Sequence, residues 1–473
     1  MKKRIGVFGW GIVAPKSPNI EAFRQNLGSS ESWLTPFNGF GPDNFLVGMP
    51  QFDFADYQNW IGERFAPRTF QRLLDKMDYP ALYAVGAFIQ SLGQNPGVEQ
   101  LLQELGSQAH VYVGTGLGSL HTIHDVSVQL HESQKRWDAF WAGREQELQE
   151  YLQELAKVDG TVIEGGIEAG KLHAIRDREK NRAKLQEKWN APEPPWNVSA
   201  NLIWNIQNTP AAQISILGKI TGMAFAPVAA CSTFGVSLRL AMSAIQNGEA
   251  KAVVIGASDP PPHPLTVGAF YNARVLSADR NVSAPLTRLH GTHVAGGAVV
   301  WIVGDMEYMQ SRGFKPLGME PLGVGVTSDA DHIITPSPDG PRAAMNQALA
   351  DAGATPADIG TWDLHATATP GDYSEVTNLR SIFPDTVLVT ARKGTFGHGM
   401  SVGGGWELTA QYLGYAEGKL FPTPLTRETL NETIGKMHQN FVFNTACDVP
   451  AGLSGKLSMG IGGINACVIS RPL

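Results

Sequence analysis

Pro227-Val-Ala-Ala-Cys-Ser-Thr-Phe-Gly235 is a turn of small residues that carries Cys231 and leads into a stretch with helical periodicity. Asn247-Gly248 follows as a helix stop signal. A thiol at the start of a helix meets unpaired backbone N–H groups and the positive end of the helix dipole, which both favour the thiolate. The segment therefore predicts a turn with a nucleophilic thiol and then a helix, the alternative being a buried structural cysteine. The apolar residues of the predicted helix are Val236, Leu238, Leu240, Ala241, Ala244 and Ile245.

Two histidines follow downstream, each where a predicted strand passes into a loop. The first closes the apolar stretch Ile359–Leu364 and opens His365-Ala-Thr-Ala-Thr-Pro-Gly-Asp372. The second ends Lys393-Gly-Thr-Phe-Gly-His398, after the β-rich run Val387–Thr390. Glycines follow it, and they let the backbone come close to a neighbour or a substrate. Either histidine alone is explained by a structural role, but three such segments in one chain favour a single catalytic site.

These three segments resemble the β-ketoacyl-acyl-carrier-protein synthases, in the branch of the thiolase superfamily that uses one cysteine and two histidines. Cys231 fits the nucleophile segment of that family. His365 to Asp372 resembles its His-Gly-Thr-Gly-Thr-Pro-x-Gly-Asp element. Lys393 to His398 resembles its Lys-Ser-x-x-Gly-His element, with Glu407 as the acid that follows.

Two further segments extend the resemblance nearly end to end. Gly268-Ala-Phe-Tyr-Asn-Ala-Arg-Val-Leu-Ser277 resembles the segment that carries the family's active-site phenylalanine, and Gly460-Ile-Gly-Gly-Ile-Asn465 resembles its C-terminal Gly-Phe-Gly-Gly-Thr-Asn. The chain also departs from the pattern. Ile461 stands where the family has a gatekeeper phenylalanine, and the turn to Asp372 is one residue shorter than usual. We therefore expect a divergent member with its own chain-length behaviour.

The resemblance implies a decarboxylative condensation in fatty acid or polyketide-like biosynthesis. Cys231 would hold the acyl group, and a malonyl thioester would lose carbon dioxide to give an enolate stabilised by His365 and His398. The backbone N–H groups of Cys231 and Ile461 would form the oxyanion hole, and Lys393 would orient neighbouring groups rather than act as a base. The expected supporting residues are Phe270, which would screen the malonyl carboxylate from water, with Thr367, Thr369, Asp372, Glu375 and Glu407.

Strand-like and helix-patterned segments alternate along the chain, which predicts a layered α/β structure with largely buried sheets. The resemblance implies a thiolase-like fold of two similar α/β halves, each with a mixed sheet and helices. Residues 1–305 would form the N-terminal half with Cys231, and residues 306–473 the C-terminal half with His365 and His398. The predicted strands are Ile5–Phe8, His110–Val113, Val253–Ile255, Val299–Val303 and Val387–Val389.

The segment from about residue 130 to 195 departs most from the family. It contains the charged stretches Arg144–Glu154 and Arg176–Arg182. Leu148, Leu152 and Leu155 form a narrow apolar stripe on an otherwise polar helix. We expect an inserted helical cap that is amphipathic rather than core-forming, either a surface helix with one packed face or a lid or partner-docking surface.

Composition agrees with this interpretation. The chain has 473 residues, 43% of them hydrophobic, and 52 glycines, which suits a compact α/β protein with two lobes. A net charge of −7 makes nucleic acid an unexpected partner. Three cysteines without metal-ligand spacing indicate a reducing compartment and no metal, and Cys447 and Cys467 are expected in the core. Neither a spanning apolar run nor a signal peptide is evident, so we expect a cytoplasmic protein without membrane association.

The resemblance also implies the partners and leaves alternatives open. No cofactor is expected beyond the phosphopantetheine arm of acyl carrier protein or CoA, which carries the substrate. The expected partners are acyl carrier protein and a second subunit, in a homodimer or a ketosynthase heterodimer. An initiating synthase would use cysteine, histidine and asparagine, which the His398 motif opposes, but an acyl-CoA primer such as acetyl-CoA stays open as an alternative. A degradative thiolase would need Cys467 as its second cysteine, and a non-catalytic chain-length partner would lack Cys231. Gly9-Trp-Gly-Ile-Val-Ala14 imitates a nucleotide-binding fingerprint, but no helix or acidic partner follows at the needed spacing.

Overall fold

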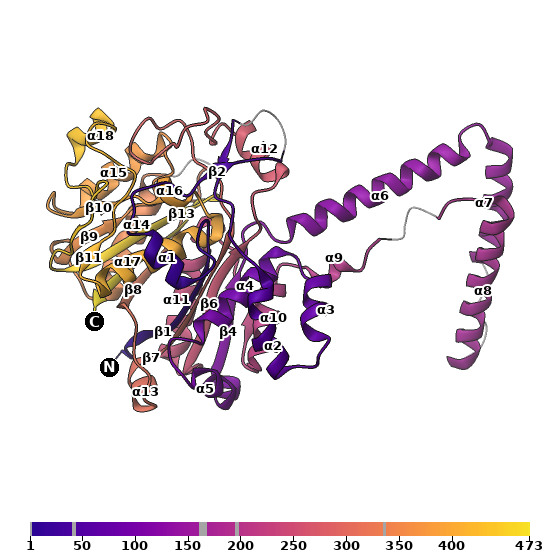
Figure 1. The fold of residues 1–473 in the computed structure, drawn as a ribbon, viewed down its shortest axis with the longest axis horizontal. Helices are drawn as coiled ribbons and strands as arrows, with labels where there is room; N and C mark the ends of the chain where they lie inside the picture. Colours follow the sequence, from indigo (N-terminus) through magenta and orange to yellow (C-terminus); the bar gives the residue numbers. More distant parts are fainter. Residues whose placement is uncertain (1, 40–43, 160–167, 194–197, 334–336) are drawn as a thin grey trace. The chain divides into compact units, whose positions relative to one another are not determined.

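Two mixed sheets form the frame of the protein (Figure 1). The computed structural model describes residues 2–39, 44–159, 168–193, 198–333 and 337–473. Each sheet has five strands, with two adjacent parallel pairings on one side and two adjacent antiparallel pairings on the other. The shared pattern shows two similar α/β halves, as the sequence predicts. The first sheet has the order β1 (Ile5–Val13), β7 (Gly297–Asp305), β6 (Ala252–Asp259), β4 (Ala109–Gly114) and β5 (Ala224–Phe225), and the second has the order β10 (Leu388–Thr390), β9 (Ile359–Asp363), β13 (Leu453–Gly460), β14 (Ile464–Pro472) and β8 (Met319–Ser328).

Helices cover both faces of each sheet. Helices α11 (Thr233–Asn247) and α17 (Gly403–Ala416) share one hydrophobic core with strands of both sheets, so they lie between them. The other face of the first sheet is covered by α4 (Tyr79–Ser91), α5 (Val98–Glu104) and α10 (Thr209–Gly218). The other face of the second sheet is covered by α14 (Asp339–Ala352) and α15 (Gly371–Ile382). The strands are therefore buried on both sides, which explains their continuous apolar runs.

All five predicted strands overlap observed ones, and none of the described helices is long and apolar enough to cross a bilayer. Two small strand pairs join β2 (Thr35–Pro36) to β3 (Leu46–Val47) and β11 (Lys419–Leu420) to β12 (Cys447–Asp448). Further helices are α1 (Ile20–Asn26), α2 (Gln58–Arg64), α3 (Thr69–Lys76), α9 (Asn201–Trp204), α12 (Pro264–Asn272), α13 (Met306–Ser311), α16 (Lys393–Phe396) and α18 (Glu432–Met437). Short 3₁₀ turns are η1 (Phe54–Tyr57), η2 (Gly106–Gln108), η3 (Ala230–Ser232), η4 (Pro356–Asp358) and η5 (Met400–Val402).

Gly9 and Gly11 lie inside strand β1 and serve packing. A Cβ atom at Gly9 would lie 2.0 Å from the carbonyl oxygen of Ser91, and one at Gly11 would lie 1.9 Å from that of Ala87. Both carbonyls belong to α4, so the two glycines let this helix approach the strand closely. The fingerprint-like sequence is therefore part of the buried sheet rather than a phosphate-binding loop.

A second compact unit, His121–Ile203, separates from the unit made of Met1–Leu120 and Trp204–Leu473. The unit is wider than the predicted insertion of about 130–195, and residues 160–167 and 194–197 lie outside the described part. Its helices are α6 (Leu120–Trp141), α7 (Glu145–Asp159) and α8 (Glu168–Trp189). The predicted division into halves at residues 305 and 306 remains a prediction of domain organisation.

The second unit has a small aromatic core of its own, which corrects the expectation that this segment is not core-forming. Trp141, Tyr151 and Leu155 are buried, and aromatic side chains supply most of the core because each buries a large apolar area. Leu148 packs against them, whereas Leu152 is 49% exposed, so the leucine stripe is only partly a packing face. The partly buried members are Trp137, Phe140, Leu148, Leu185, Trp189 and Ala191.

Replacing residues 121–203 with a flexible Gly-Ser linker is expected to leave the rest of the chain folded. The core of this unit contains only its own residues, and closing a longer or shorter loop changes the folding free energy little. We expect the variant to keep its cooperative thermal transition and to accept an acyl group on Cys231 from a small thioester, measured by mass spectrometry. The rate of condensation should fall only when the substrate is bound to acyl carrier protein. An unfolded or dissociated variant would show that the unit is structural and would contradict a lid or docking role.

Candidate active site

Cys231 lies in the tight turn η3, directly before helix α11. The preceding residue, Ala230, has a φ of 47°, a left-handed conformation that strains a residue with a Cβ atom. The Thr233 hydroxyl holds this turn, because it accepts a hydrogen bond from the N–H of Ala229 (3.0 Å) and donates one to the carbonyl oxygen of Ala230 (2.8 Å). Helix α11 ends before Gly248, whose φ of 82° makes it the predicted stop. The predicted turn and helix are both observed.

Cys231, His365 and His398 line one pocket of about 310 Å³. The Cys231 Sγ atom lies 3.2 Å from Nε2 of His398, and the two imidazole ring centroids are 5.3 Å apart with an interplanar angle of 83°. The cysteine precedes β6 of the first sheet, whereas the histidines follow β9 and β10 of the second sheet. The fold therefore brings together three side chains that lie far apart in the sequence.

Burial of Cys231 opposes the thiolate that the sequence predicts. Burial raises the pKa of the Cys231 thiol to about 11. The Lys393 charge and the backbone N–H groups of Ile461 and Cys231 act in the opposite direction but only partly offset the burial. The thiol therefore needs a base to become a nucleophile, and His398 lies within hydrogen-bond reach.

Both imidazoles are neutral. Burial lowers the pKa of His365 and of His398 well below the ordinary value, and the nearby charge of Lys393 lowers both further. A neutral imidazole has one N–H donor and one acceptor nitrogen. The Nδ1 atom of His398 has no hydrogen-bond partner among the described residues, so no neighbour fixes its tautomer. His398 can therefore accept a proton from the thiol in one step and donate a hydrogen bond in another.

Two buried carboxylates on α15 hold the loop that carries His365. Glu375 accepts hydrogen bonds from the backbone N–H groups of His365 (2.6 Å) and Ala366 (2.7 Å), and Asp372 accepts one from Thr367 (2.9 Å). Burial raises the pKa of Asp372 to about 6 and that of Glu375 to about 7. The shorter turn in this sequence therefore still places both predicted supports against the loop backbone.

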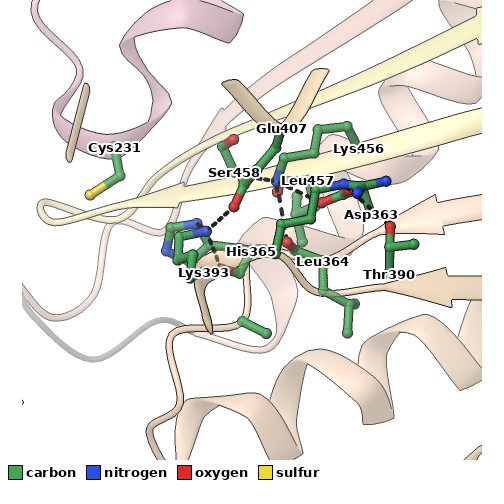
Figure 2. A network of polar contacts seen from close by, with 12 residues as sticks. Cys231, Asp363, Leu364, His365, Thr390, Lys393, Glu407, Lys456, Leu457 and Ser458 are labelled. Carbon is green, nitrogen blue, oxygen red and sulfur yellow. Dashed lines mark hydrogen bonds and ion pairs between the residues drawn. The ribbon is translucent and has the colours of Figure 1, made fainter. Parts of the chain in front are cut away.

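Lys393 lies between the His365 backbone and Glu407 (Figure 2). Its Nζ atom donates to the carbonyl oxygen of His365 and lies 3.5 Å from Nδ1 of the same residue. The Glu407 carboxylate on α17 is 2.7 Å from the ammonium, and both side chains are buried. The carboxylate that pairs with Lys393 is thus Glu407, whereas Glu375 binds the backbone N–H of His365 instead.

Glu407 has a second cationic partner that the sequence reasoning missed. Lys456 on β13 places its Nζ atom 2.8 Å from Glu407 and 4.0 Å from Asp363 (Figure 2). Arg392 lies 2.7 Å from Asp363. All four side chains are at most 2% exposed. The signal in the sequence is a single lysine within the otherwise uncharged stretch Leu453–Gly460.

Asp259, at the end of β6, is another buried acid that the sequence reasoning missed. One of its oxygens accepts hydrogen bonds from the Thr115 hydroxyl (3.1 Å) and from the N–H groups of Gly116 (2.9 Å) and Leu117 (2.8 Å). The other accepts from the N–H (2.8 Å) and hydroxyl (2.6 Å) of Ser401. Asp259 thereby ties the glycine-rich loop after β4 to the segment that follows the second histidine. The sequence pattern that could have pointed to Asp259 is an aspartate at the end of an apolar, strand-like run.

The pocket walls are mostly apolar and include the predicted Phe270 on α12. Thr367 and Thr369 also line it. Ile461 lines the pocket and is 45% exposed, so it lies where the pocket meets solvent. Gly462, with a φ of 92°, follows it in the turn between β13 and β14. The position where the resemblance implies a gatekeeper ring therefore carries a shorter, branched side chain.

The other two cysteines lie outside the pocket lining. Cys467 is fully buried on β14, and burial raises the pKa of its thiol, so it is a core residue as predicted. Cys447 on β12 is only half-buried, which corrects its predicted place in the core. Among the described residues, no three or more His, Cys, Asp or Glu side chains are grouped to hold a metal ion.

Comparison with known proteins decides the family. The model of the β-ketoacyl synthase N-terminal domain matches residues 159–307, and that of the C-terminal domain matches residues 320–426, together more than half of the chain. The chain belongs to the β-ketoacyl synthase family. Enzymes of this family are condensing enzymes of the acyltransferase class, and both matched segments contain residues that line the pocket.

Relatives and solved structures agree with this assignment. The 3-oxoacyl-[acyl-carrier-protein] synthase 2 of Vibrio harveyi is 25% identical over 488 residues, covering 100% of this chain and 99% of that protein. The protein of the same name from Staphylococcus aureus is 29% identical over 278 residues, covering 56% of this chain and 67% of that protein. The structure of the ishigamide ketosynthase/chain length factor aligns with a TM-score of 0.76 at 19% identity over 100% of both chains. A β-ketoacyl synthase from Burkholderia phymatum aligns with a TM-score of 0.74 at 18% identity over 100% of both chains. These likenesses confirm the thiolase-like fold and a divergent sequence.

Proposed function

We propose that this synthase condenses an acyl group on Cys231 with a malonyl unit on acyl carrier protein to give a 3-oxoacyl-carrier product, with loss of carbon dioxide. The observation that supports this most directly is the meeting of one thiol and two neutral imidazoles in a single apolar pocket. A thiol provides the site for a covalent acyl intermediate, and neutral imidazoles provide donors for an enolate oxygen.

In the first step, the acyl group moves from a carrier thioester to Cys231. The thiol proton passes to Nε2 of His398, 3.2 Å away, as sulfur attacks the thioester carbon. The backbone N–H groups of Cys231 and Ile461 approach the sulfur and can stabilise the negative oxygen of the tetrahedral intermediate. Collapse of the intermediate releases the carrier thiolate, which takes the proton from His398. The imidazole is thereby neutral again for the next step.

In the second step, a malonyl thioester loses carbon dioxide. The electrons of the broken carbon–carbon bond enter an enolate, whose oxygen accepts hydrogen bonds from the N–H groups of His365 and His398. The enolate carbon then attacks the carbonyl carbon of the acyl-cysteine, and the sulfur leaves as the new carbon–carbon bond forms. The thiolate sulfur then takes up a proton from solvent, because its original proton left with the first carrier, and this restores the thiol. Phe270, on the pocket wall, would shield the malonyl carboxylate from water.

Substrates would reach the pocket on the phosphopantetheine arm of acyl carrier protein or CoA, and no further cofactor takes part in these steps. The names of the Vibrio and Staphylococcus relatives include acyl carrier protein, and one solved relative, with a TM-score of 0.70, is a ketosynthase in complex with its type II polyketide carrier protein. Both a fatty acid and a polyketide-like pathway fit this chemistry. The predicted cytoplasmic location stays a prediction.

Trapping the acyl group tests the proposal. The purified protein would be incubated with acyl carrier proteins bearing chains of different length, and with acetyl-CoA, and the adduct on Cys231 would be measured by mass spectrometry. We expect adducts from acyl carriers and release of carbon dioxide when malonyl carrier is added. An adduct from acetyl-CoA alone would support the initiating synthase instead. No adduct from any donor would contradict the proposed reaction.

A ketosynthase heterodimer is the second arrangement that the comparisons favour. The solved relatives include a ketosynthase/chain length factor and a ketosynthase in complex with its chain length factor, with TM-scores of 0.76 and 0.69. Because Cys231 is present, this chain would be the catalytic subunit of such a pair rather than the silent one. Activity of the purified chain alone would favour the homodimer, and activity that appears only with a co-expressed homologue lacking the cysteine would favour the heterodimer.

A further inference from the structure

We infer that Lys456 is a positioning residue of the active site, which holds Glu407 and the His365 segment in place and keeps a positive charge beside the two imidazoles. The inference rests on the proposed function, because it concerns the same histidines. Figure 2 shows Lys456 on the side of His365 that faces away from Cys231. Lys456 lies on β13, and the end of this strand reaches the pocket at Gly460 and Ile461. Lys456 itself does not line the pocket, so it acts through its neighbours.

Besides a hydrogen bond to the carbonyl oxygen of Leu457, Lys456 contacts groups that hold His365. Its Nζ atom lies 2.8 Å from Glu407, whose other oxygen is 2.7 Å from Lys393. It also lies 3.4 Å from the carbonyl oxygen of Leu364, and Lys393 donates to the next carbonyl oxygen, that of His365. Two ammonium groups bridged by one carboxylate therefore hold two successive carbonyl groups of the same segment.

Strand pairing places Lys456 at this point. In the second sheet, Lys456 of β13 is the direct partner of Asp363 on β9, two residues before His365. Asp363 in turn lies 2.7 Å from Arg392, the residue before Lys393. The network thus joins the starts of both histidine segments to β13, and each member is carried by a rigid strand or its immediate end.

Charge balance explains why the lysine stays ionised. Three buried cations, Arg392, Lys393 and Lys456, surround two buried carboxylates, Asp363 and Glu407. Burial would lower the pKa of Lys456, but Glu407 and Asp363 together raise it above the ordinary value. Among these five side chains the cations outnumber the carboxylates by one, and Lys456 supplies that additional cation close to the imidazoles, where water screens it little.

This excess charge opposes protonation of the histidines. The pKa of His365 is lowered first by burial and then by Lys393, His398 and Lys456, and that of His398 by burial, Lys393 and Lys456. A hydrogen-bond donor that must also accept a proton from Cys231 needs to be neutral. Titratable groups from several elements surround the imidazoles. Those that line the pocket are Cys231 from η3 and Asp372 and Glu375 from α15. Those outside the pocket lining are Lys393 from α16, Glu407 from α17 and Lys456 from β13, followed by Asp363, Arg392 and Asp259.

Lys456→Met tests the inference through the pH dependence of malonyl decarboxylation. At low pH the rate should fall as the imidazoles become protonated, and this fall is the acid limb of the pH–rate profile. Removing the cation should raise the pKa of the imidazoles, so the acid limb should move to a pH about one unit higher. At a pH below the limb, the rate of the variant should be about tenfold lower than that of the parent enzyme. The variant should fold, because Arg392–Asp363 and Lys393–Glu407 remain as complete ion pairs. Lys456→Arg retains the charge and should keep the acid limb of the parent enzyme.

Glu320→Gln is a matched control for a purely structural effect. Glu320 on β8 is equally buried and lies between Arg4 (2.7 Å) and Arg471 (2.6 Å), outside the pocket lining. The Glu320→Gln substitution should lower the thermal stability of the protein without moving the acid limb of the pH–rate profile. An acid limb that is unchanged in Lys456→Met, or one that moves as far in Glu320→Gln, would overturn the inference.

An imidazole titration by NMR tests the same point without substrate and in the parent enzyme. His365, assigned as the signal missing from His365→Ala, should stay neutral at about pH 6, below which a free histidine becomes charged. A cationic His365 at that pH would overturn the inference even if Lys456→Met failed to fold. A parent enzyme that decarboxylates no malonyl thioester would refute the proposed function, while the same titration compared between the parent enzyme, Lys456→Met and Lys456→Arg would still test the role of Lys456, because burial alone also lowers the pKa of His365.

Discussion

Cys231→Ala is expected to lose covalent acylation and to keep its fold. The residue lies in a turn of small residues after Ala229 and Ala230, so alanine fits the backbone, and loss of the buried sulfur should cost about 1 kcal/mol of stability. Without the nucleophile, condensation should fall by about 10³-fold or more. Intact-protein mass spectrometry after incubation with an acyl thioester measures the adduct, and circular dichroism measures the fold.

Cys467→Ala is the matched control for this experiment. Cys467 is as deeply buried as Cys231 but lies on β14, outside the pocket lining, so its loss should leave the adduct unchanged. A covalent acyl label that persists on Cys231→Ala would refute the assignment of the nucleophile. A label that disappears only in Cys467→Ala would point to thiolase-like chemistry at the second cysteine.

His365→Ala and His398→Ala are each expected to slow malonyl decarboxylation by about 10²- to 10³-fold, the usual cost of removing one donor to a developing negative oxygen. Both imidazoles are buried, neutral and face the same pocket, so water would replace neither donor with comparable geometry. Release of labelled carbon dioxide from malonyl carrier protein measures the step. Normal decarboxylation in either variant would contradict the enolate role of that histidine.

The two histidines should differ in the acylation step. His398 lies 3.2 Å from the sulfur, and the raised pKa of the thiol means that a base is needed, so His398→Ala should also slow formation of the acyl-enzyme. His365→Ala should acylate at nearly the parent rate. His438→Ala is a control, because His438 is buried against the carbonyl oxygens of Val387 and Asn440, outside the pocket lining. Equal acylation in both active-site variants would show that His398 is not the base.

Local sequence patterns were sufficient to predict the elements that carry the site. The small residues around Cys231 predict a turn and a helix because no bulky side chain obstructs the tight backbone, and Gly248 ends that helix with a positive φ. The apolar runs before His365 and Lys393 predict strands because both faces of each sheet are covered. Both kinds of signal depend on neighbours within a few residues, so they can be read without the fold.

Other properties depend on contacts between distant residues. The pairing of Lys393 with Glu407, and of Glu407 with Lys456, requires a helix and a strand from different parts of the second half to meet. The aromatic core of the second unit likewise depends on α6, α7 and α8 packing together, which a leucine stripe on one helix did not reveal. Periodicity gives the face of a helix but not its partner.

The sequence by itself determined which residues could do the chemistry: one cysteine and two histidines, each at the end of a predicted strand or the start of a helix, in an order typical of a known family. Only the tertiary structure reveals the burial that shifts their pKa values. Burial raises the pKa of the Cys231 thiol and lowers the pKa of both imidazoles, against the local effect of the helix dipole on the thiol. The physical reason is that desolvation depends on everything packed around a group, whereas the helix dipole depends only on the chain next to it.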